Sequence, residues 1–383
     1  MKHSYIAKRF QSSAAGLSLD TEALAKYRDI IDLSIGDTDF TTDESIINAA
    51  FRDAKAGHTH YGDPKGDPEL IDAVCRAWEE DFGQRLPRDH VLVSASSCLG
   101  MALVMLAILD PGDEVIVFSP YFPMYREQIE LAGGVCVDVP TYASEDYAID
   151  EARLRAAITP RTKAIVFNNP TNPTGMGYDG KTLELLARVA QEHDLLIAAD
   201  EIYTTYLYEG DFRPIRTLPG MAERTITLNS FSKNFLMTGW RVGVIIAEPE
   251  LLAVMNRVNG SLIYSAPSIS QRAAIQALAM RKEIREKYVT AYRDRIFYAA
   301  DRIEKIPYLS LVRPKGTFYL FPGVEKTGLD EKAFCKVLLD QAHVLVSPGT
   351  PFGVSAAGHF RIACTVGIDQ LKTAFDRMEK LSF

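Results

Sequence analysis

The sequence predicts an α/β protein with a large domain, built on a mostly parallel sheet with helices on both faces, and a smaller α+β domain. From about Pro68 to Leu278, short apolar runs alternate with helical patterns. Strands that are apolar on both faces are typical of a parallel sheet buried between helices. After Leu278 the pattern changes to a long charged helical stretch, followed by mixed strands and helices.

The large domain is expected to begin with the strand HVLVSAS and the apolar helix 99–109. The strand DEVIVFSP follows, and then a helix at 124–134 that two glycines close. A further helix is expected at 180–193, between two of the later apolar runs. Strands are predicted at 90–96, 113–120, 134–140, 162–170, 194–201, 225–231 and 242–248.

The smaller domain is expected to combine the C-terminal segment with the first 45 residues, which cross over to join it. Its predicted helices are 281–306, 330–342 and a final helix, and its predicted strands are 309–314, 317–322, 344–349 and 359–365. The sequence therefore predicts an N-terminal segment at 1–45, a large domain at 46–280 and a small domain at 281–383.

Composition excludes several classes of function. The chain has 383 residues, of which 47% are hydrophobic and 24% charged, and a net charge of −8. The negative charge argues against nucleic acid or an anionic membrane as the main partner. The longest apolar stretches, such as Met101–Leu109, are too short to span a bilayer, and the first ten residues lack the apolar run of a signal peptide. Five scattered cysteines without C-x-x-C pairs predict a cytoplasmic protein with reduced thiols and no metal site.

Unusual polar residues follow the predicted strands, where function gathers in such sheets. Lys233 lies in the mostly uncharged stretch NSFSKNFLMTG. Burial lowers the pKa of a lysine and makes its amine a better nucleophile toward carbonyl groups, so Lys233 is a candidate for a Schiff base. Taken alone, a lysine that caps a turn is the commoner explanation.

Asp200 ends the apolar run LLIAA, and a buried carboxylate at that position needs a cationic partner. The protonated ring nitrogen of pyridoxal 5′-phosphate (PLP) is one such partner. Tyr203, three residues later, could direct its phenol to the same side. An ordinary turn or N-cap aspartate and a packing tyrosine are the simpler alternatives.

The loop NNPTNPTG holds two Asn-Pro steps, which make it stiff and fix the amide of Asn172. A phosphate group needs backbone N–H groups, hydroxyls and a cation, and a helix N-terminus supplies the first of these. Simple N-capping would also explain the serines. The candidates for phosphate binding are Ser96, Ser97, Cys98, Ser230, Ser232 and Arg241.

Arg361 lies in the apolar strand HFRIACT, where a guanidinium needs an anion. The α-carboxylate of a substrate or a structural ion pair would each satisfy it. Gly36 in LSIGDTDF would allow the backbone to approach closely beside such a carboxylate.

The ordered set resembles the class I and II aminotransferases, the aspartate aminotransferase superfamily of PLP enzymes with fold type I. Asn172 in NPTG, Asp200 with Tyr203, Lys233 in SFSK and Arg241 eight residues later carry the resemblance. YGDPKG (61–66), LDPGDEVIVFSPYF (109–122) and RPKGTFYLFP (313–322) match in order and spacing as well.

The resemblance implies a role for each candidate. Lys233 forms the Schiff base and moves the proton, Asp200 pairs the pyridinium, and Asn172 and Tyr203 bond the ring oxygen. Phe122 stacks on the ring, Arg361 with Gly36 receives the substrate carboxylate, and the six residues named above hold the phosphate. Tyr61 reaches the cofactor phosphate of the partner subunit, which implies a homodimer with shared active sites.

The implied reaction moves an amino group from an L-amino acid (neutral, aromatic or aspartate-like) to a 2-oxo acid by a ping-pong mechanism. Phenylalanine at position 122 and the lack of an identifiable second arginine argue against a strictly acidic substrate. A carbon–sulfur β-lyase or a cyclopropane-forming synthase would share every cofactor residue. A non-catalytic PLP-binding regulator is a further alternative, against which the complete catalytic set argues.

Overall fold

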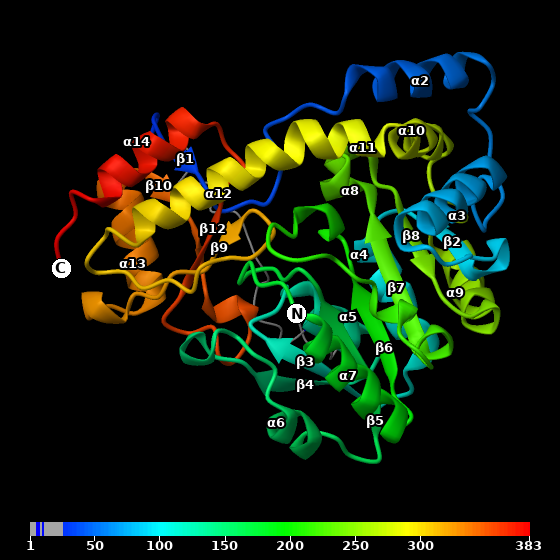
Figure 1. Cartoon of the computed structure of the whole chain (residues 1–383), viewed down its shortest axis with the longest axis horizontal. Coiled ribbons are helices and arrows are strands. Elements are labelled where there is room, and N and C mark those ends of the chain that lie inside the picture. The colour runs from blue at the N-terminus through cyan, green and yellow to red at the C-terminus, as the bar shows by residue number, and fades with distance from the viewer. Residues whose placement is uncertain (1–4, 8–9, 11–25) are drawn as a thin grey trace.

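The computed structural model describes residues 5–7, 10 and 26–383, and its centre is a seven-stranded sheet in the order β2-β8-β7-β6-β5-β3-β4 (Figure 1). All strands predicted for the large domain are present, and only β8 runs antiparallel to its neighbours β2 and β7. The strands are β2 (Val91–Ser94), β3 (Glu114–Ser119), β4 (Val135–Pro140), β5 (Thr162–Asn168), β6 (Leu196–Asp200), β7 (Thr225–Ser230) and β8 (Gly243–Ile246).

Helices cover both faces of this sheet, because successive side chains of each strand point to opposite faces. Val166 and Ala198 pack in one core with residues of α4, α5 and α9, whereas Ile165 and Ile197 pack on the other face with α7. The fold class expected from the doubly apolar strands is therefore confirmed. These helices are α4 (Ser97–Ile108), α5 (Met124–Leu131), α6 (Glu151–Ala156), α7 (Gly180–Glu192) and α9 (Pro249–Leu262).

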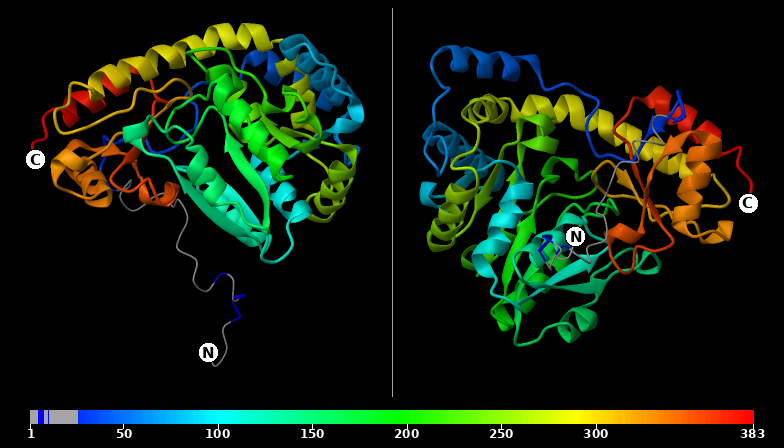
Figure 2. Two further views of the ribbon diagram at one scale, coloured as in Figure 1. Left: turned by 60° about the horizontal axis from the view of Figure 1, so that its bottom comes forward. Right: turned by 180° about the vertical axis from the view of Figure 1, so that it is seen from behind.

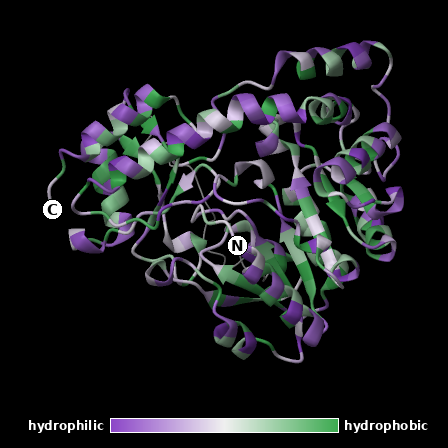
Figure 3. Cartoon of the chain, in the orientation of Figure 1, coloured by the Kyte–Doolittle hydropathy of each residue, from purple (hydrophilic) through white to green (hydrophobic). Residues whose placement is uncertain are grey.

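Further helices extend the large part of the molecule and connect it to the smaller part. Hydrophobic residues concentrate in the strands, and the outward faces of the helices are mostly hydrophilic (Figure 3). The long helical run Arg281–Ile303 passes from the helices beside the large sheet to the small sheets (Figure 2). These helices are α2 (Glu44–Lys55), α3 (Pro68–Phe82), α8 (Phe231–Asn234), α10 (Ser268–Ala279), α11 (Arg281–Ile284) and α12 (Thr290–Ile303).

The smaller part contains two short sheets and has its own core. β1 (Ile31–Asp32) pairs in parallel with β10 (Val344–Leu345), so the N-terminal segment crosses over as expected. Ile31 and Leu33 belong to the same core as Ile362 and Phe375. The other elements are β11 (Ser347–Pro348), β12 (Phe360–Ala363) and β9 (Tyr319–Leu320), which form an antiparallel sheet, together with α13 (Glu331–Val337) and α14 (Ile368–Met378).

Several expectations for the smaller part were wrong in detail. The helix predicted at 330–342 ends in a π-helical stretch, Leu338–Ala342, and the strand predicted at 344–349 is divided into β10 and β11. The helix predicted at 281–306 contains a π-helical turn, Arg285–Val289, between α11 and α12. The strand predicted at 309–314 makes only an isolated bridge between Ser310 and Gly323. Pro307 and Pro314 bracket that run, and a proline has no N–H group to give to a sheet.

Some expectations fall on residues outside the described part of the chain. Most of the first 25 residues, including much of the stretch in which no signal peptide is expected, are among them. The boundaries at 45 and 280 stay predictions. Among the described residues, no helix is long and apolar enough to cross a bilayer, and no group of His, Cys, Asp or Glu side chains is arranged to hold a metal ion.

Candidate active site

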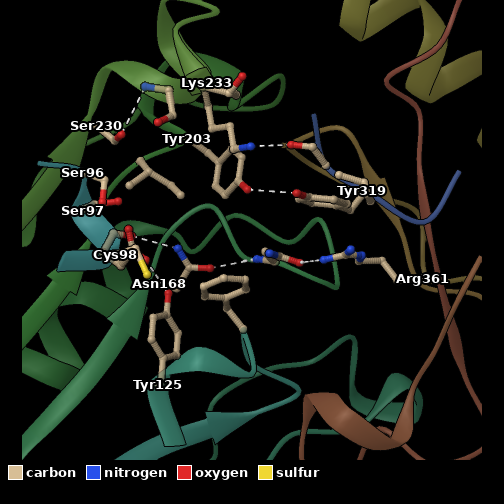
Figure 4. Close-up of a pocket in the computed structure, with 18 of the residues that line it drawn as sticks. Ser96, Ser97, Cys98, Tyr125, Asn168, Tyr203, Ser230, Lys233, Tyr319 and Arg361 are labelled. Carbon is tan, nitrogen blue, oxygen red and sulfur yellow. Dashed lines mark hydrogen bonds between the residues drawn. The ribbon is translucent and has the colours of Figure 1, made fainter. Parts of the chain in front are cut away.

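A cavity of about 560 Å³ lies beyond the carboxyl ends of β5, β6 and β7, and residues of the smaller part close its other side. Of the candidate residues from the sequence, Tyr61 alone does not line it. Figure 4 shows Lys233, Tyr203 and Arg361 together in this cavity, with Ser96, Ser97 and Cys98 at another side of it. The sequence therefore brings most of its candidates to one place, because parallel strands end at the same edge of a sheet.

Lys233 lies on α8, the short helix that follows β7 directly. Its Nζ donates a hydrogen bond to the carbonyl oxygen of Gly36. Burial lowers the pKa of Lys233 from 10.5 to about 8; the nearby charge of Asp37 opposes the shift, and the positive charges of Arg361 and Arg241 add to it. About half of the Lys233 side chains therefore carry the neutral, nucleophilic amine near pH 8.

Asp200 is the last residue of β6, and its carboxylate is buried. Its Oδ2 accepts a hydrogen bond of 2.5 Å from the hydroxyl of Tyr125, but its Oδ1 has no hydrogen-bond partner among the described residues. Burial raises the pKa of Asp200 to about 6, and the hydrogen bond from Tyr125 limits the rise. A buried acceptor without a partner at the wall of a cavity is suited to a donor that a ligand supplies.

The loop after β5 is fixed by its own side chains. Asn168 Nδ2 donates to the carbonyl oxygen of Asp200 at 2.9 Å, and Asn168 Oδ1 accepts the backbone N–H of Asn172 at 2.8 Å. The amide of Asn172 is thereby held between the ends of β5 and β12. Its Oδ1 accepts a hydrogen bond of 3.0 Å from Arg361.

Arg361 on β12 is buried, and it makes no ion pair with the described residues. Its Nη2 donates to the carbonyl oxygen of Ser34 at 2.6 Å, and its Nε is buried without a partner. The guanidinium carbon lies 4.7 Å from the ring centre of Tyr319 and 5.0 Å from that of Phe352. The described residues therefore give Arg361 no carboxylate partner, and its guanidinium can receive an anion.

The N-terminus of α4 lines another side of the cavity and is suited to an anion. Ser96 caps this helix by accepting the N–H of Leu99 at 3.2 Å, and its backbone has a φ of 93°. Close packing leaves no room for a side chain at Gly243, where a Cβ would lie 2.9 Å from the backbone nitrogen of Ser97. Exposed N–H groups at a helix N-terminus favour phosphate.

Hydroxyls and a cation surround this helix N-terminus. Ser230 caps α8 by accepting the N–H of Ser232 at 3.1 Å. Arg241 is exposed, and its Nη1 donates to the carbonyl oxygen of Thr238 at 2.8 Å. Cys98 is exposed, and its carbonyl oxygen accepts a hydrogen bond from Gln128 at 2.8 Å.

The sequence interpretation missed several residues of the site. Tyr125 binds Asp200, Asn168 fixes the Asn172 loop, and Tyr319 contacts Tyr203 and Arg361. Asn168 stands in the quoted NNPTNPTG loop, whereas Tyr319 stands among apolar and aromatic neighbours that resemble core packing, and Tyr125 stands inside a predicted helix. Tyr61, the remaining candidate, is 88% exposed, and its ring packs against Tyr264 at 5.2 Å.

Phe122 and Tyr203 complete the walls of the cavity. The ring of Phe122 lies 5.7 Å from that of Tyr125 in an edge-to-face arrangement. The Tyr203 hydroxyl donates to the hydroxyl of Tyr319 at 3.2 Å.

Comparisons with known proteins agree with this arrangement. The family described as aminotransferase class I and II matches residues 28–378. The aspartate/prephenate aminotransferase of Thermus thermophilus is 37% identical over 98% of both chains, and the arginine–pyruvate transaminase of Pseudomonas aeruginosa is 35% identical over 99% of this chain and 97% of the relative. A double mutant of the Thermus thermophilus aspartate aminotransferase superposes with a TM-score of 0.94 at 35% identity, over 99% of this chain and all of the other. The chain belongs to the class I and II aminotransferases, and it is an enzyme of amino-group transfer.

Proposed function

We propose that this chain uses PLP to move an amino group from an L-amino acid to a 2-oxo acid in two half-reactions. One observation carries the proposal: Lys233, the unpartnered Oδ1 of Asp200 and the unpaired guanidinium of Arg361 line one cavity. An amine of lowered pKa, a buried acceptor and a buried cation are the three groups that PLP and an amino acid together would engage.

The donor set fits PLP. Asp200 Oδ1 would receive the ring N–H, Phe122 would stack on the ring, and Asn172 with Tyr203 would bond the ring oxygen. The phosphate would lie at the N-terminus of α4, held by Ser96, Ser97, Cys98, Ser230, Ser232 and Arg241. When bound, PLP supplies an electron sink for the charge that develops at the substrate Cα.

The side chains of this protein would then divide the work. Arg361 would bind the substrate α-carboxylate, which could replace the Ser34 carbonyl as its partner. Asp200 would hold a proton on the ring nitrogen. Lys233 would first attach the cofactor and then, as a free amine, move the proton to and from the substrate Cα. The second half-reaction would use the same groups in reverse order, which gives ping-pong kinetics.

The cavity favours donors with uncharged side chains. Among its described lining residues, the cations are Lys233, Arg241 and Arg361, and each has a role in the proposal. The wall from the smaller part is largely apolar, with Ile35 and Leu345 among its residues. The relatives are named for an acidic and for a basic amino acid, so their names do not point to one class of donor. The preference for neutral or aromatic donors therefore rests on the residues that line the cavity.

The proposal is tested by adding each L-amino acid to the protein loaded with PLP and recording the visible absorbance. Neutral and aromatic amino acids should remove the visible absorbance band of the bound PLP in a single turnover, and a 2-oxo acid should restore this band. No bleaching with any amino acid would overturn the proposal. Pyruvate and ammonia released from cystathionine without a 2-oxo acid would instead favour a β-lyase.

We also propose a homodimer in which Tyr61 completes the site of the partner subunit. Tyr61 is 88% exposed in one chain, and its ring partner Tyr264 ends a run of three exposed apolar or aromatic side chains. Isolated exposed patches of this kind mark interaction surfaces. The exposed residues are Tyr61, Leu262, Ile263 and Tyr264. Cytoplasmic location stays a prediction.

Complementation between two inactive variants tests this dimer. Tyr61→Ala and Lys233→Ala each damage a different half of the same site, so a mixed dimer would contain one intact site. Coexpression should recover roughly a quarter of the wild-type activity after random pairing. Activity no higher than that of Tyr61→Ala alone would show that Tyr61 does not act across subunits.

A further inference from the structure

Tyr319 contacts residues from three separate parts of the cavity. It lies on β9 and is buried, with 2% of its surface exposed. Its hydroxyl accepts the hydrogen bond of 3.2 Å from Tyr203, and the Arg361 guanidinium lies over its ring at 4.7 Å. Figure 4 shows Tyr319 between these two residues.

The third contact of Tyr319 is with Gly36. A Cβ at Gly36 would lie 1.7 Å from the Tyr319 hydroxyl oxygen, so this hydroxyl occupies the space that a side chain would need. The carbonyl oxygen of the same Gly36 accepts the hydrogen bond from Lys233. Tyr319 therefore fixes the backbone that holds the reactive amine.

We propose that Tyr319 is a positioning residue whose hydroxyl sets the donor strength of Tyr203 and whose ring holds Arg361 ready for a carboxylate. This inference rests on the proposed function, because it concerns the cofactor and substrate partners of those two residues.

The hydroxyl part follows from the number of protons available. A phenol has one proton to donate and can also accept hydrogen bonds. When Tyr203 turns its proton to the ring oxygen of the cofactor, its own oxygen is free to accept from Tyr319. Accepting a hydrogen bond strengthens a donor, because the two bonds polarise each other. Tyr319 would thereby help Tyr203 to stabilise negative charge on the ring oxygen.

The ring part follows from the surroundings of Arg361. Its charge is buried without a carboxylate from the described residues, and its fixed partners are the Ser34 carbonyl, the Asn172 amide oxygen and two ring faces. The negative face of an aromatic ring stabilises a cation without occupying its N–H donors. The Nε donor, which has no partner among the described residues, therefore remains available to a substrate.

Two substitutions separate these effects. Tyr319→Phe removes the hydroxyl and keeps the ring, whereas Tyr319→Leu removes both. Tyr308→Phe is the matched control, because Tyr308 is also a buried tyrosine of the smaller part and its hydroxyl also donates a hydrogen bond, to the Met378 carbonyl in place of the cavity. Near-ultraviolet circular dichroism establishes folding, and Tyr319→Met replaces the leucine variant if that variant does not fold.

The readouts are the pH titration of the visible absorbance of the PLP-loaded protein and the concentration of amino acid that gives half-maximal single-turnover bleaching. Tyr319→Phe should raise the pKa of the absorbance change by about 0.5 and leave the half-maximal concentration within about twofold. Tyr319→Leu should raise both the pKa of the absorbance change and the half-maximal concentration of amino acid, the latter by about tenfold. Tyr308→Phe should change neither.

The inference is overturned if the titration of Tyr319→Phe superposes on that of the wild type, or if the ringless variant needs no more amino acid than the wild type does. A failure of the proposed function would look different, since the wild-type protein itself would then show no titrating band or no bleaching. If the wild type titrates and bleaches as expected and the Tyr319 variants behave like it, this inference is wrong and the proposed function still stands.

Discussion

Replacing Lys233 with methionine in the cofactor-free protein should increase the free energy of unfolding at neutral pH. The lysine lines a cavity in which burial disfavours its charged form, and its pKa falls from 10.5 to about 8. Methionine has a similar length and no charge, so it avoids this penalty. A residue proposed to be essential for activity should therefore be a cost to stability.

The size and pH window of the effect follow from the two pKa values. The folded chain binds the lysine proton less tightly than the unfolded chain, so the penalty is full below pH 8 and fades as the pH approaches 10.5. The difference between these values corresponds to about 3 kcal/mol. The free energy of unfolding of Lys233→Met should exceed that of the wild type by about 3 kcal/mol at pH 7 and by about 1 kcal/mol at pH 10.

Urea unfolding of cofactor-free wild type and Lys233→Met between pH 7 and pH 10 measures this gap. Lys181→Met is the control, because Lys181 is exposed on α7 and its replacement should leave the gap near zero at every pH. A gap for Lys233→Met that is absent, or that stays constant across this range, would refute the reasoning that burial depresses the pKa of Lys233.

Three further outcomes are expected. Asp200→Asn removes the negative charge offered to the ring nitrogen and should slow single-turnover bleaching by about 10- to 150-fold in stopped-flow absorbance; an unchanged rate would exclude this pairing. Arg361→Lys loses the forked donor geometry and should raise KM for the amino acid by about 10- to 100-fold in steady-state assays, and an unchanged KM would place the carboxylate elsewhere. Gly36→Ala would put a Cβ 1.7 Å from the Tyr319 hydroxyl and should cost about 1–3 kcal/mol of stability in urea unfolding, whereas Gly180→Ala, where a Cβ meets nothing within 4 Å, should cost nothing.

The large sheet could be predicted from the sequence because each of its strands is a short apolar run with a clear end. The same regularity placed Lys233, Asp200 and Asn172 at one edge, since they follow parallel strands. The strand predicted at 309–314 was wrong, because an apolar run does not reveal whether its N–H groups meet a partner strand. Prolines at its two ends were the available signal.

The supporting residues of the site were harder to predict. Tyr125 and Tyr319 are the clearest cases, since a single tyrosine in a helix or a strand is most often a packing residue. Only the folded chain shows that the Tyr125 hydroxyl meets Asp200 and that the Tyr319 ring lies under Arg361. Their roles depend on contacts between residues far apart in the sequence, which local patterns do not encode.

Two of the three cations that line the cavity, Lys233 and Arg361, bind main-chain carbonyl groups of one segment. Lys233 binds the carbonyl of Gly36, and Arg361 binds the carbonyl of Ser34, two residues earlier in the same crossing segment. Main-chain oxygens carry no full charge, so the proposed cofactor and substrate would replace them as partners without having to separate an ion pair. No side-chain substitution at these two positions deletes the carbonyls themselves. A redesign that aims to change how Lys233 and Arg361 are held before a ligand binds would therefore have to move the backbone of this one short segment.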